Sequence, residues 1–252
     1  MTEWYTLPGF NQPMSSMSHL IGALVYLVLS FFLLRRAWRT RATFWNASLF
    51  AFAAVTLLSL SGVYHMFSPS GKAGRVMIRL DVAAIFFMIA STFTPIHGLL
   101  FSGWKRWGIL IPLWTIAITG ITLRTIFFSN IPLIVGTGIF LLMGWIGGWS
   151  AFLLAKQYGR RALYPTIMGG VMYTIGAVGD ALSWPTIIPL VWGSHETFHF
   201  FVLAGLGFHW SFVADIVDGK FKSGSEEIEA GKNCSESIEA EKDGHSLTAA
   251  HA

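Results

Sequence analysis

The sequence predicts an all-α membrane protein: a seven-transmembrane helical bundle followed by a disordered C-terminal tail. Of its 252 residues, 54% are hydrophobic and 12% are charged, whereas an average soluble domain is about 25% charged. Seven apolar runs follow one another, most of them near the roughly 20 residues that a helix needs to cross a bilayer. Helices are the only reasonable form for such runs in lipid, because they satisfy their own backbone hydrogen bonds.

The predicted elements are separated by polar, basic or turn-forming segments. After a short N-terminal lead (residues 1–13), the expected spans are 14–34, 44–67, 79–101, 107–123, 131–155, 162–182 and 195–217, which together form one membrane domain over residues 14–219. The connections in order are the basic RRAWRTR, the loop SPSGKAGR, the turn WKRW, residues 124–130, the basic residues 156–161 and a linker rich in Trp and Pro. The fourth span is the shortest.

The charges divide into a basic membrane domain and an acidic tail. Up to Gly219 there are 13 Lys and Arg against 6 Asp and Glu, while residues 220–252 carry 4 Lys against 7 Asp and Glu. The tail has almost no large apolar side chain and is expected to be disordered. The basic residues of the membrane domain lie in loops, where they set topology, and are no argument for nucleic-acid binding.

Alternate loops carry unequal positive charge, 9 Lys and Arg on one side against 4 on the other when the tail is excluded. The positive-inside rule then predicts a multi-pass protein of the plasma (inner) membrane with a cytoplasmic C-terminus. The single cysteine, Cys234, excludes a disulfide within one chain and a cysteine-based metal site.

The segment HETFH places two histidines near the start of the last span. His195 and His199 are four residues apart, so they share one helical face and one metal ion can bind both. Such a polar pair is costly in a lipid-buried helix unless it is satisfied. The pair alone is weak evidence for a metal.

Seven crossings bring further polar residues to the same membrane face. The end of span two carries Ser61 and His65, span three begins with Asp81, and span seven begins with His195 and His199. Three neutral imidazoles with an open fourth position form a zinc site of the catalytic type. Zinc lowers the pKa of bound water to about 7, and a nearby carboxylate can pass its proton to a leaving group. The alternative is a hydrogen-bonded polar cluster that locks the bundle without metal.

Other polar residues are expected to stay outside this cluster. His209 lies roughly 15 Å further along the same helix and is predicted to pack in the bundle. Glu196 either orients a metal ligand through a hydrogen bond, without touching the metal itself, or faces the headgroups. His19 and Asp180 are expected at the side of the membrane opposite His195.

Three segments resemble the hemolysin III family, the bacterial branch of the progestin and adiponectin receptor superfamily. They are SGVYHMFSPSGKAGRVMIRLDVAAIFFMIASTFTP, LYPTIMGGVMYTIGAVGDAL and HETFHFFVLAGLGFHW. The resemblance implies seven helices, a zinc ion held by His65, His195 and His199, and Ser61 and Asp81 near the zinc-bound water. It also implies kinship with alkaline ceramidases. The first motif departs from the family, because SSMS precedes His19 where an acidic residue and an asparagine are frequent.

Two functions remain open at this point, with a third less favoured. The first is a zinc-dependent intramembrane hydrolase of a lipid amide or ester, with a membrane lipid as substrate or ligand. The second is a non-catalytic sensor or receptor with structural zinc. A pore or transporter is least favoured, because no span carries a polar stripe along its whole length.

Overall fold

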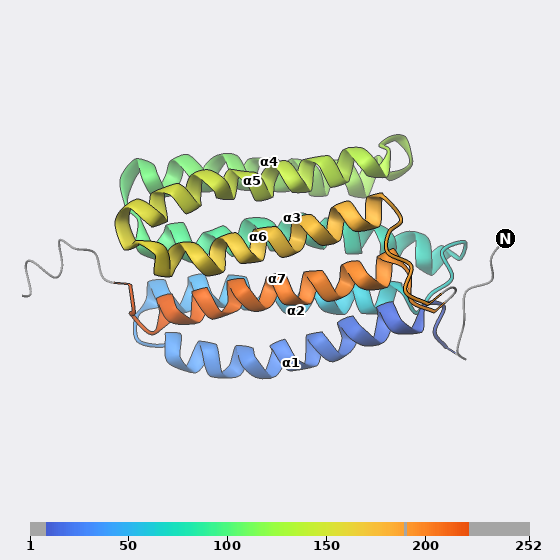
Figure 1. Ribbon diagram of the computed structural model, residues 1–252, viewed down its shortest axis with the longest axis horizontal. Coiled ribbons are helices and arrows are strands. Elements are labelled where there is room, and N and C mark those ends of the chain that lie inside the picture. The colour runs from blue at the N-terminus through green and yellow to red at the C-terminus, as the bar shows by residue number, and fades with distance from the viewer. Residues whose placement is uncertain (1–8, 189–190, 222–252) are drawn as a thin grey trace, which may run out of the picture.

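The chain folds into a bundle of long helices that run roughly parallel or antiparallel to one another (Figure 1). The computed structural model describes residues 9–188 and 191–221. This described part contains seven α-helices and one 3-10 turn, with no β-strand. The helices are α1 (Pro13–Ala37), α2 (Arg41–Tyr64), α3 (Lys72–Leu100), α4 (Gly103–Ile126), α5 (Leu133–Tyr158), α6 (Arg160–Ala181) and α7 (Ser194–Val217), with η1 (Phe128–Asn130) between α4 and α5. The predicted all-α fold is confirmed.

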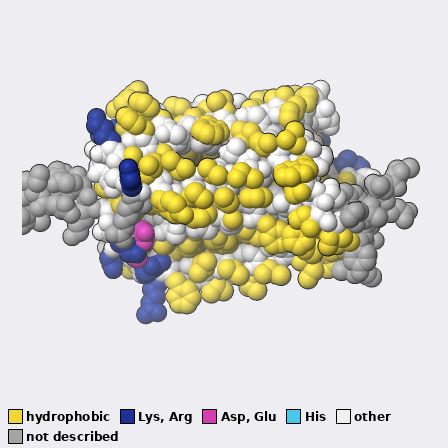
Figure 2. Space-filling view, viewed as in Figure 1, with side chains coloured by type: hydrophobic (Ala, Val, Ile, Leu, Met, Phe, Trp, Pro, Cys, Tyr) yellow, Lys and Arg dark blue, Asp and Glu magenta, His cyan; other side chains and the backbone are white. Residues whose placement is uncertain are grey.

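Six of the described helices are long and apolar enough to cross a membrane, and α6 is the exception. Its composition explains this, because the Gly, Thr, Tyr and Pro residues between the charged ends of α6 lower the hydropathy of the helix. Large apolar side chains such as Leu24, Phe31 and Trp145 are exposed on the outside of the bundle. Figure 2 shows hydrophobic side chains along the bundle and Lys and Arg towards its ends. A surface of this kind is stable in lipid, so the protein is an integral membrane protein.

Several helices extend beyond the apolar runs from which their spans were predicted. α3 begins at Lys72, so the second half of the expected loop SPSGKAGR is helical. α4 covers Gly103–Ile126 and exceeds the predicted span at both ends. A hydropathy pattern marks only the part of a helix inside the hydrocarbon, whereas polar interfacial residues can continue the same helix.

Close contacts between neighbouring helices hold the bundle together. One cluster of buried residues joins α1, α2 and α7 and includes Phe50, Leu206 and Trp210, and a second joins α3, α4 and α5 around Phe86. A Cβ added to Gly62 on α2 would lie 2.7 Å from the Leu20 side chain on α1, so α1 and α2 approach closely there.

The alternation of helix directions determines which ends meet. The starts of α1, α3 and α7 and the ends of α2 and α6 lie at one end of the bundle (Figure 1). The polar residues carried by these helix ends therefore share one region of the protein.

Candidate metal centre

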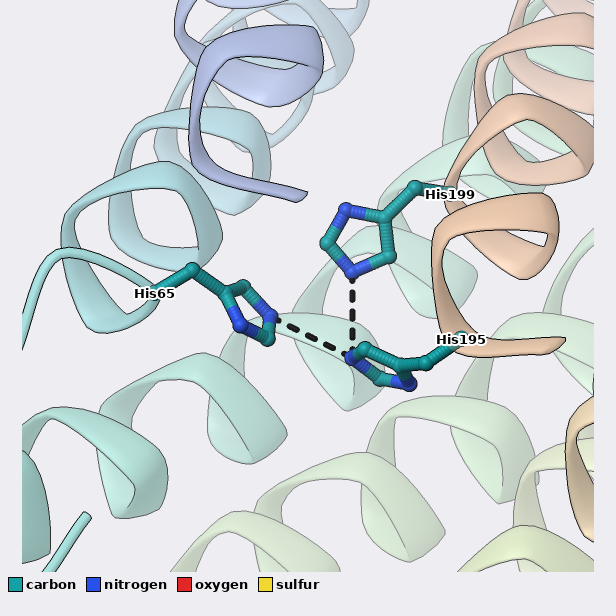
Figure 3. A group of neighbouring side chains, drawn as sticks. All are labelled: His65, His195 and His199. Atoms are coloured by element: carbon teal, nitrogen blue, oxygen red, sulfur yellow. Dashed lines mark hydrogen bonds between the residues drawn. The ribbon is translucent and has the colours of Figure 1, made fainter. Parts of the chain in front are cut away.

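Three histidines from two helices meet at this end of the bundle (Figure 3). The Nε2 atom of His195 lies 3.3 Å from Nε2 of His65 and 3.2 Å from Nε2 of His199. One ligand atom from each of the three residues lies within 4.8 Å of the other two. His65 and His199 are buried and His195 is half-buried. The cluster could hold a metal ion.

The opposite ring nitrogen of each histidine has its own hydrogen-bond partner. Nδ1 of His65 bonds the side-chain amide oxygen of Gln12. Nδ1 of His195 lies 3.3 Å from both carboxylate oxygens of Asp180. Nδ1 of His199 lies 3.2 Å from the backbone oxygen of Ser15.

These partners determine which nitrogen carries the proton. An amide oxygen, a carboxylate and a backbone carbonyl only accept hydrogen bonds, so each Nδ1 must donate. In a neutral imidazole the other nitrogen, Nε2, then presents a lone pair. Three lone pairs that face one another repel unless a cation lies between them. The donor set therefore fits a divalent metal such as zinc, which takes neutral imidazole ligands.

The three candidate ligands are positioned in two ways. His195 and His199 lie four residues apart in the first turns of α7, which places both rings on one helical face. His65 instead follows the last residue of α2, where its backbone N–H donates to the Ser61 carbonyl at 3.2 Å. Burial, and to a smaller extent the neighbouring His195, lowers the pKa of His65, which favours the neutral form of its ring.

Ser61 and Asp81 lie beside the cluster. Ser61 is buried in the last turn of α2, and Asp81 is half-buried on α3. The electrostatic neighbours of the Asp81 carboxyl group include His195 and the Ser61 hydroxyl. The structure thus brings both residues to the histidines, while their chemical roles stay predictions.

Glu196 connects α7 to the first turn of α1. One carboxylate oxygen accepts a hydrogen bond from the Ser15 hydroxyl at 2.9 Å, and the other accepts one from the Gly193 backbone N–H at 2.9 Å. Glu196 is buried and does not face solvent or headgroups. Glu196 contacts the candidate ligands only indirectly. It holds the Ser15 hydroxyl, and the backbone carbonyl of Ser15 bonds His199.

The expectations for His19 and Asp180 were wrong. The ring of His19 stacks on the ring of His199 with 3.8 Å between centroids, and Asp180 bonds His195. Span one begins on the same side of the membrane as span two ends, and span six ends where span seven begins. Applied consistently, the rule that located His65 would also have located these two residues.

Two further residues at the site were not predicted from the sequence, Gln12 and Ser15. Both lie at the start of α1, which the same count of crossings places at this face. His209 lies outside the cluster and stacks on Tyr173 with 5.6 Å between centroids. Its position agrees with the expectation of a packing role.

The fold and site define a class of protein: an all-helical integral membrane protein with a buried three-histidine cluster at one end of its bundle. A family model described as haemolysin-III related matches residues 9–210, and the chain belongs to this family.

Two bacterial proteins are similar in sequence. Hemolysin-3 of Bacillus cereus is 30% identical over 134 residues, which is 53% of this chain and 58% of that protein. The hemolysin-3 homolog of Bacillus subtilis strain 168 is 26% identical over 194 residues, which is 76% of this chain and 87% of that protein. The B. cereus match thus covers little more than half of that relative.

Proposed function

We propose that this protein is a zinc-dependent hydrolase that cleaves an amide or ester bond of a membrane lipid. One observation carries the proposal: the Nε2 atoms of three histidines converge while a separate acceptor holds each Nδ1 proton. Three imidazole ligands leave the fourth zinc position open, as catalytic zinc sites require. The helix ends that carry the site lie at one end of the bundle (Figure 1), where lipid headgroups would surround them.

Zinc bound here would supply hydroxide near neutral pH. Asp81, whose carboxyl group neighbours His195, would take the proton of the attacking water and return it to the leaving amine or alcohol. The Ser61 hydroxyl, as a neighbour of that carboxyl group, would help to orient it. Asp180 accepts the His195 Nδ1–H bond and so raises the basicity of that ligand.

Metal analysis of the purified protein tests the metal site. The wild type is expected to contain close to one zinc per chain, whereas His65→Ala and His199→Ala lose it. His209→Ala is the matched control, because His209 is a buried histidine on the same helix as His199 but outside the cluster. Equal zinc content in all four proteins would overturn the proposed site.

Lipid turnover tests the chemistry. A fluorescent N-acyl sphingoid amide and a fluorescent phospholipid ester in mixed micelles are suitable probes. Asp81→Asn is expected to keep its zinc and to lose about 10²- to 10⁴-fold in turnover, the usual contribution of a general acid–base group. Wild-type protein that holds zinc but cleaves neither probe would favour the alternative, a sensor or receptor with structural zinc.

We also propose that the protein resides in the plasma (inner) membrane with its C-terminus in the cytoplasm. The unequal distribution of Lys and Arg between alternate loops supports this orientation. A green fluorescent protein fused after the last residue is expected to fluoresce, while alkaline phosphatase at the same place stays inactive. The reverse pattern would invert the orientation and place the histidine site at the cytoplasmic face.

A further inference from the structure

The segment before α1 is hydrogen-bonded to the segment after α2. The backbone N–H of Gln12 donates to the His65 carbonyl at 3.0 Å, and that of Asn11 donates to the Met66 carbonyl at 3.2 Å. The side chain of Gln12 adds a third bond, from its amide oxygen to Nδ1 of His65. Gln12 therefore contacts both the backbone and the ring of one candidate metal ligand.

His65 needs such support more than the other two histidines do. His195 and His199 belong to the continuous helix α7, whose backbone hydrogen bonds set their spacing. His65 is the C-cap of α2, and its chain continues into a turn. Its ring has rotamer freedom that the end of a helix does not remove. The contacts with Gln12 fix both the place and the rotation of the ring.

We propose that Gln12 is a positioning residue of the metal centre, which selects the Nδ1–H tautomer of His65 and directs its Nε2 lone pair at the metal. This inference rests on the proposed zinc site and deepens it. Gln12 acts through His65 and touches neither metal nor substrate. Partners of this kind typically change metal affinity about 10- to 100-fold when they are lost.

The same stretch of chain also supports a second ligand. Ser15, in the first turn of α1, accepts the Nδ1–H bond of His199 through its backbone carbonyl, and its hydroxyl is held by Glu196. Two of the three ligands thus depend on the start of α1. No substitution removes the Ser15 carbonyl, so Gln12 is the position at which this dependence can be tested by mutation.

Zinc affinity measured by competition with a chromophoric chelator tests the proposal in detergent-solubilised full-length protein. Gln12→Leu keeps a side chain of similar size but removes the acceptor, and is expected to bind zinc about 10- to 100-fold more weakly. Gln12→Glu keeps an acceptor for the Nδ1–H bond and is expected to bind at least as tightly as the wild type. Asn11→Leu is the control, since Asn11 makes the neighbouring backbone bond but no side-chain hydrogen bond to any described residue.

The outcomes separate a positioning role from a purely structural one. A structural role would lower the melting temperature of the zinc-free protein in Gln12→Leu without restoring zinc affinity in Gln12→Glu. The proposal is overturned if Gln12→Leu binds zinc as tightly as the wild type, or if Gln12→Glu binds more weakly. If Gln12→Leu does not fold, the affinity of Gln12→Glu decides. If the wild type binds no zinc, the proposed function itself is overturned. If the wild type binds zinc and the Gln12 variants bind it equally well, only the positioning role is overturned.

Discussion

Asp180 offers the sharpest single test of how the histidine cluster is built. Its two carboxylate oxygens each lie 3.3 Å from Nδ1 of His195, at the end of α6. In Asp180→Asn the charge is lost, and the amide can accept the same hydrogen bond only as a neutral group. In Asp180→Ala the acceptor is gone, and the His195 ring is free to take the other tautomer.

The expected magnitude follows from the distance and the exposure of the pair. The separation is slightly longer than a short charge-assisted bond, and both side chains are about one-third exposed, at 37% and 35%. Water therefore weakens the interaction. We expect the lower half of the usual 10- to 100-fold range for Asp180→Asn, and the upper half for Asp180→Ala. Together these effects span about 1.4 to 2.8 kcal/mol of zinc-binding free energy.

Chelator competition, as for Gln12, measures these affinities. Asp215→Asn is the matched control, because Asp215 bonds Lys220 at the opposite end of α7 and touches none of the histidines. Zinc affinity should fall in the order wild type, Asp180→Asn, Asp180→Ala, with Asp215→Asn equal to the wild type. Unchanged affinity in Asp180→Ala would refute the argument that the Nδ1 acceptors determine the metal-binding tautomers.

Three other changes have expected outcomes. In Gly205→Val the new Cβ would lie 2.7 Å from the Tyr173 ring, so the α6–α7 contact should lose about 1–3 kcal/mol, seen as a lower melting temperature in detergent. Arg124→Met removes donors to the carbonyls of Ile131 and Pro132 in the α4–α5 connection and should lower stability by about 1–3 kcal/mol. It should not change zinc content, because these partners are not part of the histidine cluster; a loss of zinc would contradict that independence. Zinc at 100 times its dissociation constant should stabilise the wild type by about 2.7 kcal/mol and leave His199→Ala unaffected, and equal shifts in both would place the zinc elsewhere.

The number of helix crossings predicted more of the site than the HETFH motif did. HETFH on its own predicts no more than two ligands on one helical face. His65 is far away in the sequence, but each crossing reverses the chain, so a residue at the end of span two must lie at the same face as the start of span seven. The structure brings the three histidines together, with Asp81 and Ser61 beside them. The direction of each helix alone was sufficient to place these residues at one face of the membrane.

The contacts of α1 and α6 show what the helix count does not provide. It places Gln12, Ser15, His19 and Asp180 at the correct face when applied consistently, but it does not say which helices are neighbours around the bundle. The bond from Gln12 to His65 also needs the conformation of two irregular segments, before α1 and after α2. Hydropathy carries no information on such segments, since they lie where the apolar pattern stops.

The arrangement of ligands and acceptors also couples the metal to the fold. The ligands come from α2 and α7, while the groups that hold them come from α1 and α6, so four helices meet through one small polar cluster. At the other end of the bundle, Arg36 in the last turn of α1 pairs with Asp218, just after α7, at 3.0 Å on the surface, where an ion pair contributes little. Zinc binding should therefore stabilise the histidine end more than this surface ion pair stabilises the opposite end. Slower amide hydrogen exchange on zinc addition is expected in residues 9–20 and 61–66, and not at the C-terminal end of α7.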